Sequence, residues 1–198
     1  TIFSVMSKLA QEHNAINLSQ GFPDFATHPK LIEFVAKAMQ NGNNQYAPMQ
    51  GLLGLRNYIS EKTSADYGCN YHPETEITIT AGATQAIFTA IAAVINPGDE
   101  VIIFEPAYDC YSPTIKLFGG LVKPFELHAP DYTIDWEMVK KLFTANTKMI
   151  ILNTPNNPSG SILNKNDIDS LIKLTKNTDV LIVSDEVYGN IIFDTEIH

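Results

Sequence analysis

The sequence predicts an α/β fold in which a mostly parallel sheet is covered by helices on both faces. Segments such as EVIIFEP, MIILNTP and VLIVS consist largely of β-branched residues and leucine. This composition is typical of strands that are buried on both faces. Helical patterns about ten residues long separate the segments, as crossover helices do between parallel strands. The chain therefore contains at least part of one α/β domain.

The first predicted elements are helices. Apolar residues recur at helical spacing over residues 31–39, between Pro29 and Gly42, which suit the start and the end of a helix. The same spacing returns from Leu52, after the turn-rich sequence NNQYAPMQG. We expect the first 30 residues to be loop-like and peripheral to the α/β body.

From residue 76 onward, strands and helices are expected to alternate. The predicted strands are residues 76–80, 100–106, 121–127, 149–155 and 180–188. The predicted helices are residues 84–95, 112–118, 136–143 and 166–176. In sheets of this kind, ligands bind at the loops that follow the carboxyl ends of the strands. Those loops are therefore the candidate site.

The composition narrows the classes of function. The net charge is -9, and no stripe of lysine and arginine points to nucleic acid or to a membrane surface. No apolar run approaches the roughly 18 residues that a membrane span requires. Cys69 and Cys110 form no CxxC pair, which favours a reducing, cytoplasmic setting for a soluble protein. We expect no metal, because the five histidines lack ligand spacing: His13, His28, His72, His128 and His198.

Two of the loops combine small and aromatic residues. After the first predicted strand, Gly82 permits a tight turn, and Ala83 and Thr84 open a helix whose free amides suit a phosphate. An ordinary capped turn is the alternative. After the second strand come Tyr108 and Tyr111, which suit stacking on a flat heterocycle or plain packing over the sheet edge.

Two further loops carry an amide, a carboxylate and a phenol. Asn157 precedes Pro158, which holds it extended and directs its amide into the crevice, with a plain turn as the alternative. Asp185 and Glu186 end the last apolar strand, where alternation allows at most one of them to face the site. Tyr188 adds a phenol nearby.

Six motifs give the chain a resemblance to a known family: NLSQGFPDF, NQYAPMQG, TAGATQA, EPAYDCYSP, LNTPNNPSG and SDEVY. In order and spacing they resemble class I and II aminotransferases, fold-type I enzymes that use pyridoxal 5′-phosphate (PLP). The methionine and kynurenine aminotransferase branch is the most similar. The resemblance covers essentially the whole chain. It implies that residues 31–198 are an incomplete PLP-binding large domain and that residues 1–30 belong to the small-domain and entrance region.

The resemblance also implies a role for each site residue. Asp185 would pair with the protonated pyridine nitrogen of PLP, which keeps the ring an electron acceptor. Asn157 and Tyr188 would hydrogen-bond the phenolic oxygen of the ring, and Tyr108 would stack on its face. The phosphate would be held by two backbone amides, those of Ala83 and Thr84.

Two residues near the start of the chain complete the implied site. Gly21 would lie beside the substrate carboxylate, where only a residue without a side chain leaves room and where Asn157 also binds. Tyr46 would reach the phosphate in the neighbouring subunit. The implied partners are therefore amino acid and 2-oxo acid substrates and a second copy of the chain in a homodimer.

The implied activity is transfer of the amino group of an L-amino acid, methionine or an aromatic one, to a 2-oxo acid. A PLP-dependent cysteine-conjugate β-lyase is an alternative with the same fold and cofactor. The family uses a lysine downstream of the aspartate, but none follows Asp185, and Arg56 is the single arginine beside twelve lysines. We therefore expect a part of a longer enzyme; a non-catalytic fragment without the lysine is the remaining alternative.

Overall fold

The computed structural model describes residues 2–21, 23 and 25–193. The chain divides into two compact units, Thr1–Met49 and Gln50–His198. The two units are defined by contacts within this chain alone. The assignment of residues 1–30 and 31–198 to two parts of a larger fold therefore stays a prediction.

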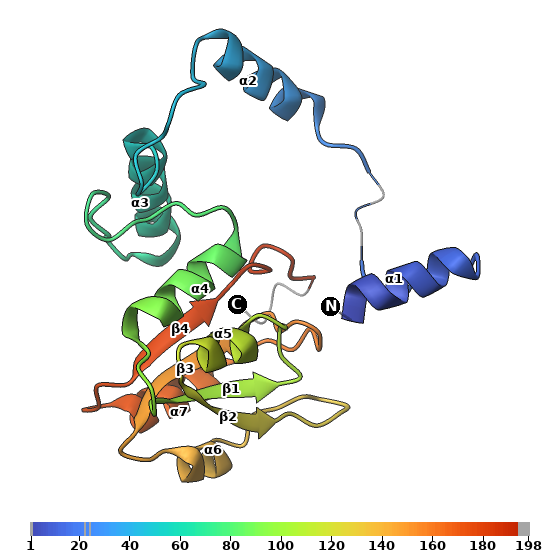
Figure 1. The fold of residues 1–198 in the computed structure, drawn as a ribbon. Helices are drawn as coiled ribbons and strands as arrows, with labels where there is room; N and C mark the ends of the chain where they lie inside the picture. Colours follow the sequence, from blue (N-terminus) through green and yellow to red (C-terminus); the bar gives the residue numbers. More distant parts are fainter. Residues whose placement is uncertain (1, 22, 24, 194–198) are drawn as a thin grey trace. The chain divides into compact units, whose positions relative to one another are not determined.

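The described part of the first unit contains two helices, α1 (Ile2–Glu12) and α2 (Pro29–Gln40) (Figure 1). α2 matches the helix that the sequence predicts after Pro29. The Nδ1 atom of His28 caps it by accepting a hydrogen bond from the Lys30 N–H at 3.2 Å. Helix α2 therefore begins where a cap and a proline coincide.

The expectation of a loop-like start is wrong for the segment that forms α1. Ile2, Val5, Met6 and Leu9 recur at the spacing of one helical face, which is a sufficient signal for an amphipathic helix. All four side chains are exposed in this chain. Helix α1 therefore has an apolar face that the described residues of this chain do not bury.

The second unit carries an α/β sheet of four described strands, all paired in parallel in the order β2-β1-β3-β4 (Figure 1). In chain order the elements are α3 (Leu53–Tyr67), α4 (Ala83–Val94), β1 (Glu100–Glu105), α5 (Tyr111–Leu117), β2 (Leu121–Glu126), α6 (Trp136–Leu142), β3 (Thr147–Asn153), α7 (Lys165–Thr175) and β4 (Leu181–Asp185). The parallel pairing and the intervening helices confirm the predicted α/β class.

The core lies on both faces of this sheet, because successive side chains of a strand point in opposite directions. On one face, side chains of β1 and β3 pack against α4 and α5: Val101, Ile103, Met149 and Ile151 against Ile87, Ile91 and Ile115. On the other face they pack against α6 and α7: Ile102, Phe104, Ile150 and Leu152 against Val139 and Leu171. Helices therefore cover both faces, as predicted.

The strand predicted at residues 76–80 does not form. A strand requires a ladder of hydrogen bonds to a neighbour, and the described residues supply no such ladder here. Ile79 N–H instead donates to the Gln50 carbonyl at 2.9 Å. A β-carbon at Gly51 would lie only 2.4 Å from the Ile79 side chain, so this close approach requires glycine. The alternating sequence favours an extended backbone for this segment, but it does not supply a neighbouring strand to pair with.

The carboxyl edge of the sheet brings several loops together. β3 and β4 run in register to their ends, where Asn153 is paired with Asp185. The loop after β1 leads into α5, and α4 begins beside the same edge, since its residues Ala83 and Thr84 line one pocket with Asp185. Among the helices described, none is long and apolar enough to cross a membrane.

Candidate active site

A pocket of about 240 Å³ lies at the carboxyl edge of the sheet. It is lined by Ala83, Thr84, Tyr108, Asn153, Asn157, Asp185, Val187 and Tyr188. The lining includes the six residues of the second unit that the sequence singled out for a cofactor. They come from the start of α4 and from the loops after β1, β3 and β4, so segments up to about a hundred residues apart meet here, as the topology of a parallel sheet requires.

Asp185 is the only carboxylate among the residues that line this pocket. Its side chain is 9% exposed. Oδ2 accepts a hydrogen bond from the Tyr111 hydroxyl at 2.6 Å, and Oδ1 accepts one from the Val187 N–H at 3.2 Å. The neighbouring Glu186 is exposed and bonded by the Ser184 hydroxyl, as strand alternation predicts. One acid of the pair therefore faces the pocket.

No cation within the described part of the chain pairs with Asp185. The ion pairs found there involve other carboxylates, and the sole arginine, Arg56, donates instead to the carbonyls of Gly51 and Pro73. A buried charge is costly unless it is paired. The pocket is therefore suited to a ligand that brings a positive charge to Asp185.

The start of α4, unlike Asp185, favours a negatively charged group of a ligand. Gly82 precedes the helix with a φ of 95°, a conformation that favours glycine, and no side chain caps the helix. The first amides of a helix have no partner within it and lie at the positive end of its dipole. The Thr84 hydroxyl lies 3.2 Å from the Tyr108 hydroxyl. An anion such as a phosphate therefore finds donors on this side.

Asn153 links two segments that line the pocket, the end of β4 and the loop after β3, through hydrogen bonds of its side chain. Its side-chain amide donates to the Asp185 carbonyl at 2.9 Å, while its Oδ1 accepts from the Asn157 N–H at 2.6 Å. The sequence analysis did not select this residue. Its position as the last residue of a strand was the available signal, since the carboxyl end of a strand faces the site.

The two asparagines before Pro158 have different surroundings. Asn156 is buried, and its Oδ1 accepts hydrogen bonds from the backbone N–H and the hydroxyl of Ser159, which closes the turn. Asn157 lines the pocket, and its bond to Pro158 is cis. Tyr188 lines the pocket from the turn after β4 with a partly exposed side chain. Asn157 and Tyr188 thus both line the pocket, and their roles toward a ring oxygen of a ligand stay predictions.

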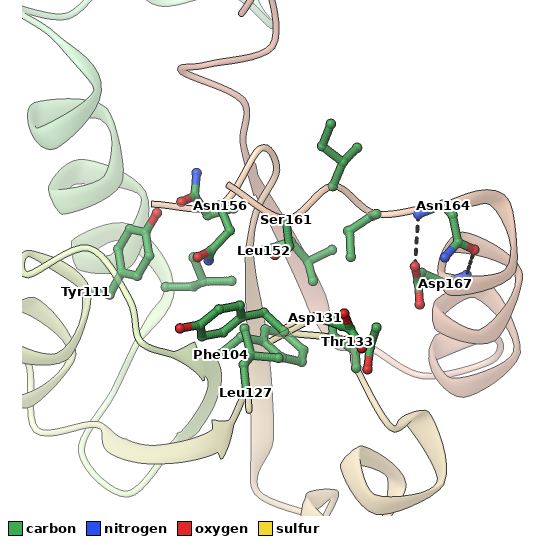
Figure 2. Close-up of a pocket in the computed structure, with 16 residues that line it drawn as sticks. Phe104, Tyr111, Leu127, Asp131, Thr133, Leu152, Asn156, Ser161, Asn164 and Asp167 are labelled. Atoms are coloured by element: carbon green, nitrogen blue, oxygen red, sulfur yellow. Dashed lines mark hydrogen bonds between the residues drawn. The ribbon is translucent and has the colours of Figure 1, made fainter. Parts of the chain in front are cut away.

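Tyr111 is a second residue that the sequence analysis noted but did not place in the site. It is buried, and it touches Asp185 without lining the pocket that Asp185 faces. It lines instead a smaller cavity of about 60 Å³, together with Phe104 and Asn156 (Figure 2). Burial, followed by the hydrogen bond to Asp185 and its charge, raises the pKa of the Tyr111 phenol. The phenol therefore stays protonated and remains a donor.

The two remaining predicted residues, Gly21 and Tyr46, belong to the first unit. Tyr46 is fully exposed in this chain, and a β-carbon at Gly21 would meet nothing within 4 Å. Their roles toward a substrate and a neighbouring subunit stay predictions. Within the described residues, no cluster of histidine, cysteine or acidic side chains is arranged to hold a metal.

The fold and the site together define a class of protein. It is an α/β protein whose pocket combines a helix start suited to an anion, an aromatic side chain and a buried carboxylate that pairs with no cation of the described residues. Residues 13–198 match the family described as aminotransferase class I and II. The chain therefore belongs to the aminotransferase class I and II family.

Individual relatives agree with this assignment. Methionine aminotransferase of Escherichia coli K12 is 46% identical over 198 residues, which are all of this chain and 51% of that enzyme. Kynurenine–oxoglutarate transaminase 1 of Rattus norvegicus is 36% identical over 96% of this chain and 48% of its own length. The chain thus spans about half the length of the curated relatives it matches.

Solved structures show the same similarity in three dimensions. The Escherichia coli protein YbdL, described with a methionine aminotransferase function, has a TM-score of 0.95 at 45% identity, covering all of this chain and 52% of that one. N-succinyldiaminopimelate aminotransferase of Mycobacterium tuberculosis has a TM-score of 0.94 at 34% identity, with the same coverage. These neighbours confirm the predicted fold, of which this chain forms about half.

Proposed function

We propose that the intact protein is a PLP-dependent aminotransferase that moves the amino group of an L-amino acid to a 2-oxo acid. The observation that carries the proposal is Asp185, a buried carboxylate that faces a pocket and lacks a cationic partner within the described chain. A protonated pyridine ring supplies that partner. The membership of the aminotransferase family and the similarity to named aminotransferases support the same reading.

The donor set of the pocket fits PLP. Its phosphate matches the uncapped start of α4, where the amides of Ala83 and Thr84 are available. Its flat ring matches the aromatic face of Tyr108, and its ring nitrogen matches Asp185. When bound, PLP draws electron density from the substrate α-carbon into its cationic ring.

The residues of this chain would prepare that chemistry rather than transfer the α-proton. Asp185 would hold the proton on the ring nitrogen through its negative charge. Asn157 and Tyr188 would donate to the phenolic oxygen of the ring. No lysine lines the pocket that the described residues form. The proton transfer that the family assigns to a lysine is therefore assigned to no residue of this chain.

The substrate proposal is methionine or an aromatic amino acid. It rests on the motif NQYAPMQG and on the identity of 46% to a methionine aminotransferase. The test is to incubate the purified intact protein with PLP and methionine and to record the visible spectrum. Methionine should convert the yellow cofactor to its amino form, and a 2-oxo acid should restore the colour. A spectrum that no amino acid changes would end the proposal, whereas pyruvate and ammonia released from a cysteine conjugate would indicate β-elimination.

We also propose a homodimer with shared sites, located in the cytoplasm. The dimer rests on the resemblance that assigns Tyr46 to the phosphate of a neighbouring subunit, and the location on the free cysteines Cys69 and Cys110. Mixed dimers of Asp185→Asn and Tyr46→Phe subunits test the sharing. If each site takes one residue from each subunit, a mixed dimer has one unaltered site and exceeds the mean activity of the two parent variants, whereas unshared sites give that mean.

A further inference from the structure

Tyr111 contacts both Asp185, which would pair with the nitrogen of the cofactor ring, and Tyr108, which would stack on the face of that ring. It lies at the start of α5 and is 2% exposed, packed in the apolar cluster that includes Ile103 and Ile115. Its hydroxyl donates to Oδ2 of Asp185 at 2.6 Å, across 74 positions of the sequence. Its ring meets the ring of Tyr108 edge to face, with centroids 6.0 Å apart and planes at 75°. One buried side chain therefore contacts both.

The hydrogen bond to Asp185 has a fixed direction. Burial raises the pKa of the Tyr111 phenol, and the hydrogen bond and charge of Asp185 raise it further. The phenol is therefore a donor throughout the neutral range. Because the Val187 N–H binds the other oxygen at 3.2 Å, the carboxylate is held at both oxygens and resists rotation.

Tyr111 acts from outside the cofactor pocket. It is absent from the residues that line that pocket. It faces instead the small cavity of Figure 2, where it lies next to Asn156 and on the opposite side from Asn164 and Asp167. Because Tyr111 does not line the pocket, any influence on a bound ring would pass through Asp185 and Tyr108, which Tyr111 contacts.

We propose that Tyr111 is a positioning residue, which fixes the carboxylate of Asp185 relative to the aromatic plate of Tyr108. This inference rests on the proposed function, since the two contacts matter for a bound pyridine ring. The hydrogen bond orients the acid toward the ring nitrogen. The edge-to-face contact, a geometry that aromatic pairs favour, keeps Tyr108 at a constant tilt.

The central variant is Tyr111→Phe in the intact protein, which keeps the ring and removes the donor. The dissociation constant of PLP should rise by up to about 10-fold, because the bond exists with and without the ligand and binding loses only its orienting effect on Asp185. In an Asp185→Asn background the same change should have little further effect, because coupled residues are not additive. The matched control is Tyr132→Phe, since Tyr132 lines the same cavity but makes none of the hydrogen bonds found at the Asp185 carboxylate.

Two further measurements separate positioning from general stability. The visible circular dichroism of bound PLP reports the ring orientation and should weaken in Tyr111→Phe but not in Tyr132→Phe. In protein without cofactor, the Tyr111 phenol should ionise at lower pH in Asp185→Asn than in the wild type, with Tyr111→Phe identifying the signal. This second measurement needs neither PLP nor activity.

The outcomes distinguish the inference from the function. If the wild type binds PLP but Tyr111→Phe matches it in affinity and dichroism, the positioning role is refuted and the proposed function stands. If the phenol titrates identically in Asp185→Asn and the wild type, the pairing itself is refuted. If the wild type binds no PLP, the proposed function fails and this inference fails with it.

Discussion

Asp185 and Glu186 are adjacent in the sequence but differ in their surroundings, which makes them a matched pair for mutation. Asp185→Asn removes the negative charge that would hold the proton on the ring nitrogen. Turnover should fall on the order of 100-fold or more, the usual effect of losing one preorganised electrostatic contact. Glu186→Gln changes an exposed side chain and should leave turnover nearly unchanged. Steady-state kinetics of both intact variants with methionine test this; equal losses would contradict the assignment of Asp185.

The sequence was sufficient to identify the residues that line the pocket wherever local rules apply. Alternation along β4 predicts that only one of its two terminal acids faces the site, and the turn at Gly82 predicts a helix start suited to an anion. Asn153 and Tyr111 were not selected, because their importance lies in hydrogen bonds to Asp185 across 32 and 74 positions. Such partners depend on side-chain directions in the folded sheet, which no local pattern contains.

Cys110 offers a second test at the residue scale. Burial raises the pKa of its thiol to about 11, and the charges of Asp109 and Asp185 act in the same direction. Because the raised pKa belongs to the folded state, the stabilisation from the protonated thiol is present below the ordinary thiol pKa of 9.0 and is lost as the pH rises through about 11. The thiol should therefore react slowly with alkylating reagents at neutral pH.

The exposed Cys69 is the internal control for that test. Labelling the intact protein over a pH series and mapping the peptides by mass spectrometry compares the two thiols. Cys69 should be modified first at neutral pH, and Cys110 should approach it only in strongly alkaline solution. Equal rates near neutrality would contradict the burial of Cys110.

At the scale of the elements, the sequence predicted the four described strands of the sheet, whether fully buried, as β1 and β3, or partly exposed, as β2. β1 and β3 have nearly continuous apolar sequences because both faces of the sheet are covered. Residues 76–80 show the limit of this reasoning, since β propensity does not supply a neighbouring strand. α1 shows the converse, because its apolar stripe forms a helix whose face is exposed in this chain.

Helix α4 contributes side chains both to the core and to the pocket, so its packing can be tested directly. Ile91 on this helix is 0% exposed. Ile91→Ala should destabilise the unit by about 2–5 kcal/mol, the usual range for a large-to-small change in a core. Ile172→Ala on α7 removes the same atoms from a side chain that is 55% exposed, and should change stability by about 0.5 kcal/mol or less.

Hydrogen exchange is the appropriate measurement for this pair, because the α4 amides report local opening even in a protein of several units. Exchange within Ala83–Val94 should accelerate strongly in Ile91→Ala and remain near the wild-type rate in Ile172→Ala. Similar exchange in both variants would show that α4 does not depend on its apolar face.

At the scale of the whole molecule, the family motifs are divided between two units of the chain. The second unit contains the pocket, the first contains the motif around Gly21, and the motif around Tyr46 spans the boundary in the sequence between Met49 and Gln50. The pocket itself joins the start of α4 to the loops after three strands, which are far apart in the sequence. A ligand that binds all of these segments stabilises the unit as a whole rather than one loop.

The thermal stability of the intact protein should therefore respond to the cofactor skeleton even without the aldehyde. Pyridoxine 5′-phosphate keeps the ring nitrogen for Asp185 and the phosphate for the start of α4, but forms no bond with a lysine. At a hundred times its dissociation constant it should stabilise the folded protein by about 2.7 kcal/mol. At the same concentration, pyridoxine, which lacks the phosphate, should have a much smaller effect. Asp185→Asn should reduce the response to both compounds. A melting temperature that rises only with the aldehyde, and equally in wild type and Asp185→Asn, would show that the contacts of this chain do not hold the ring.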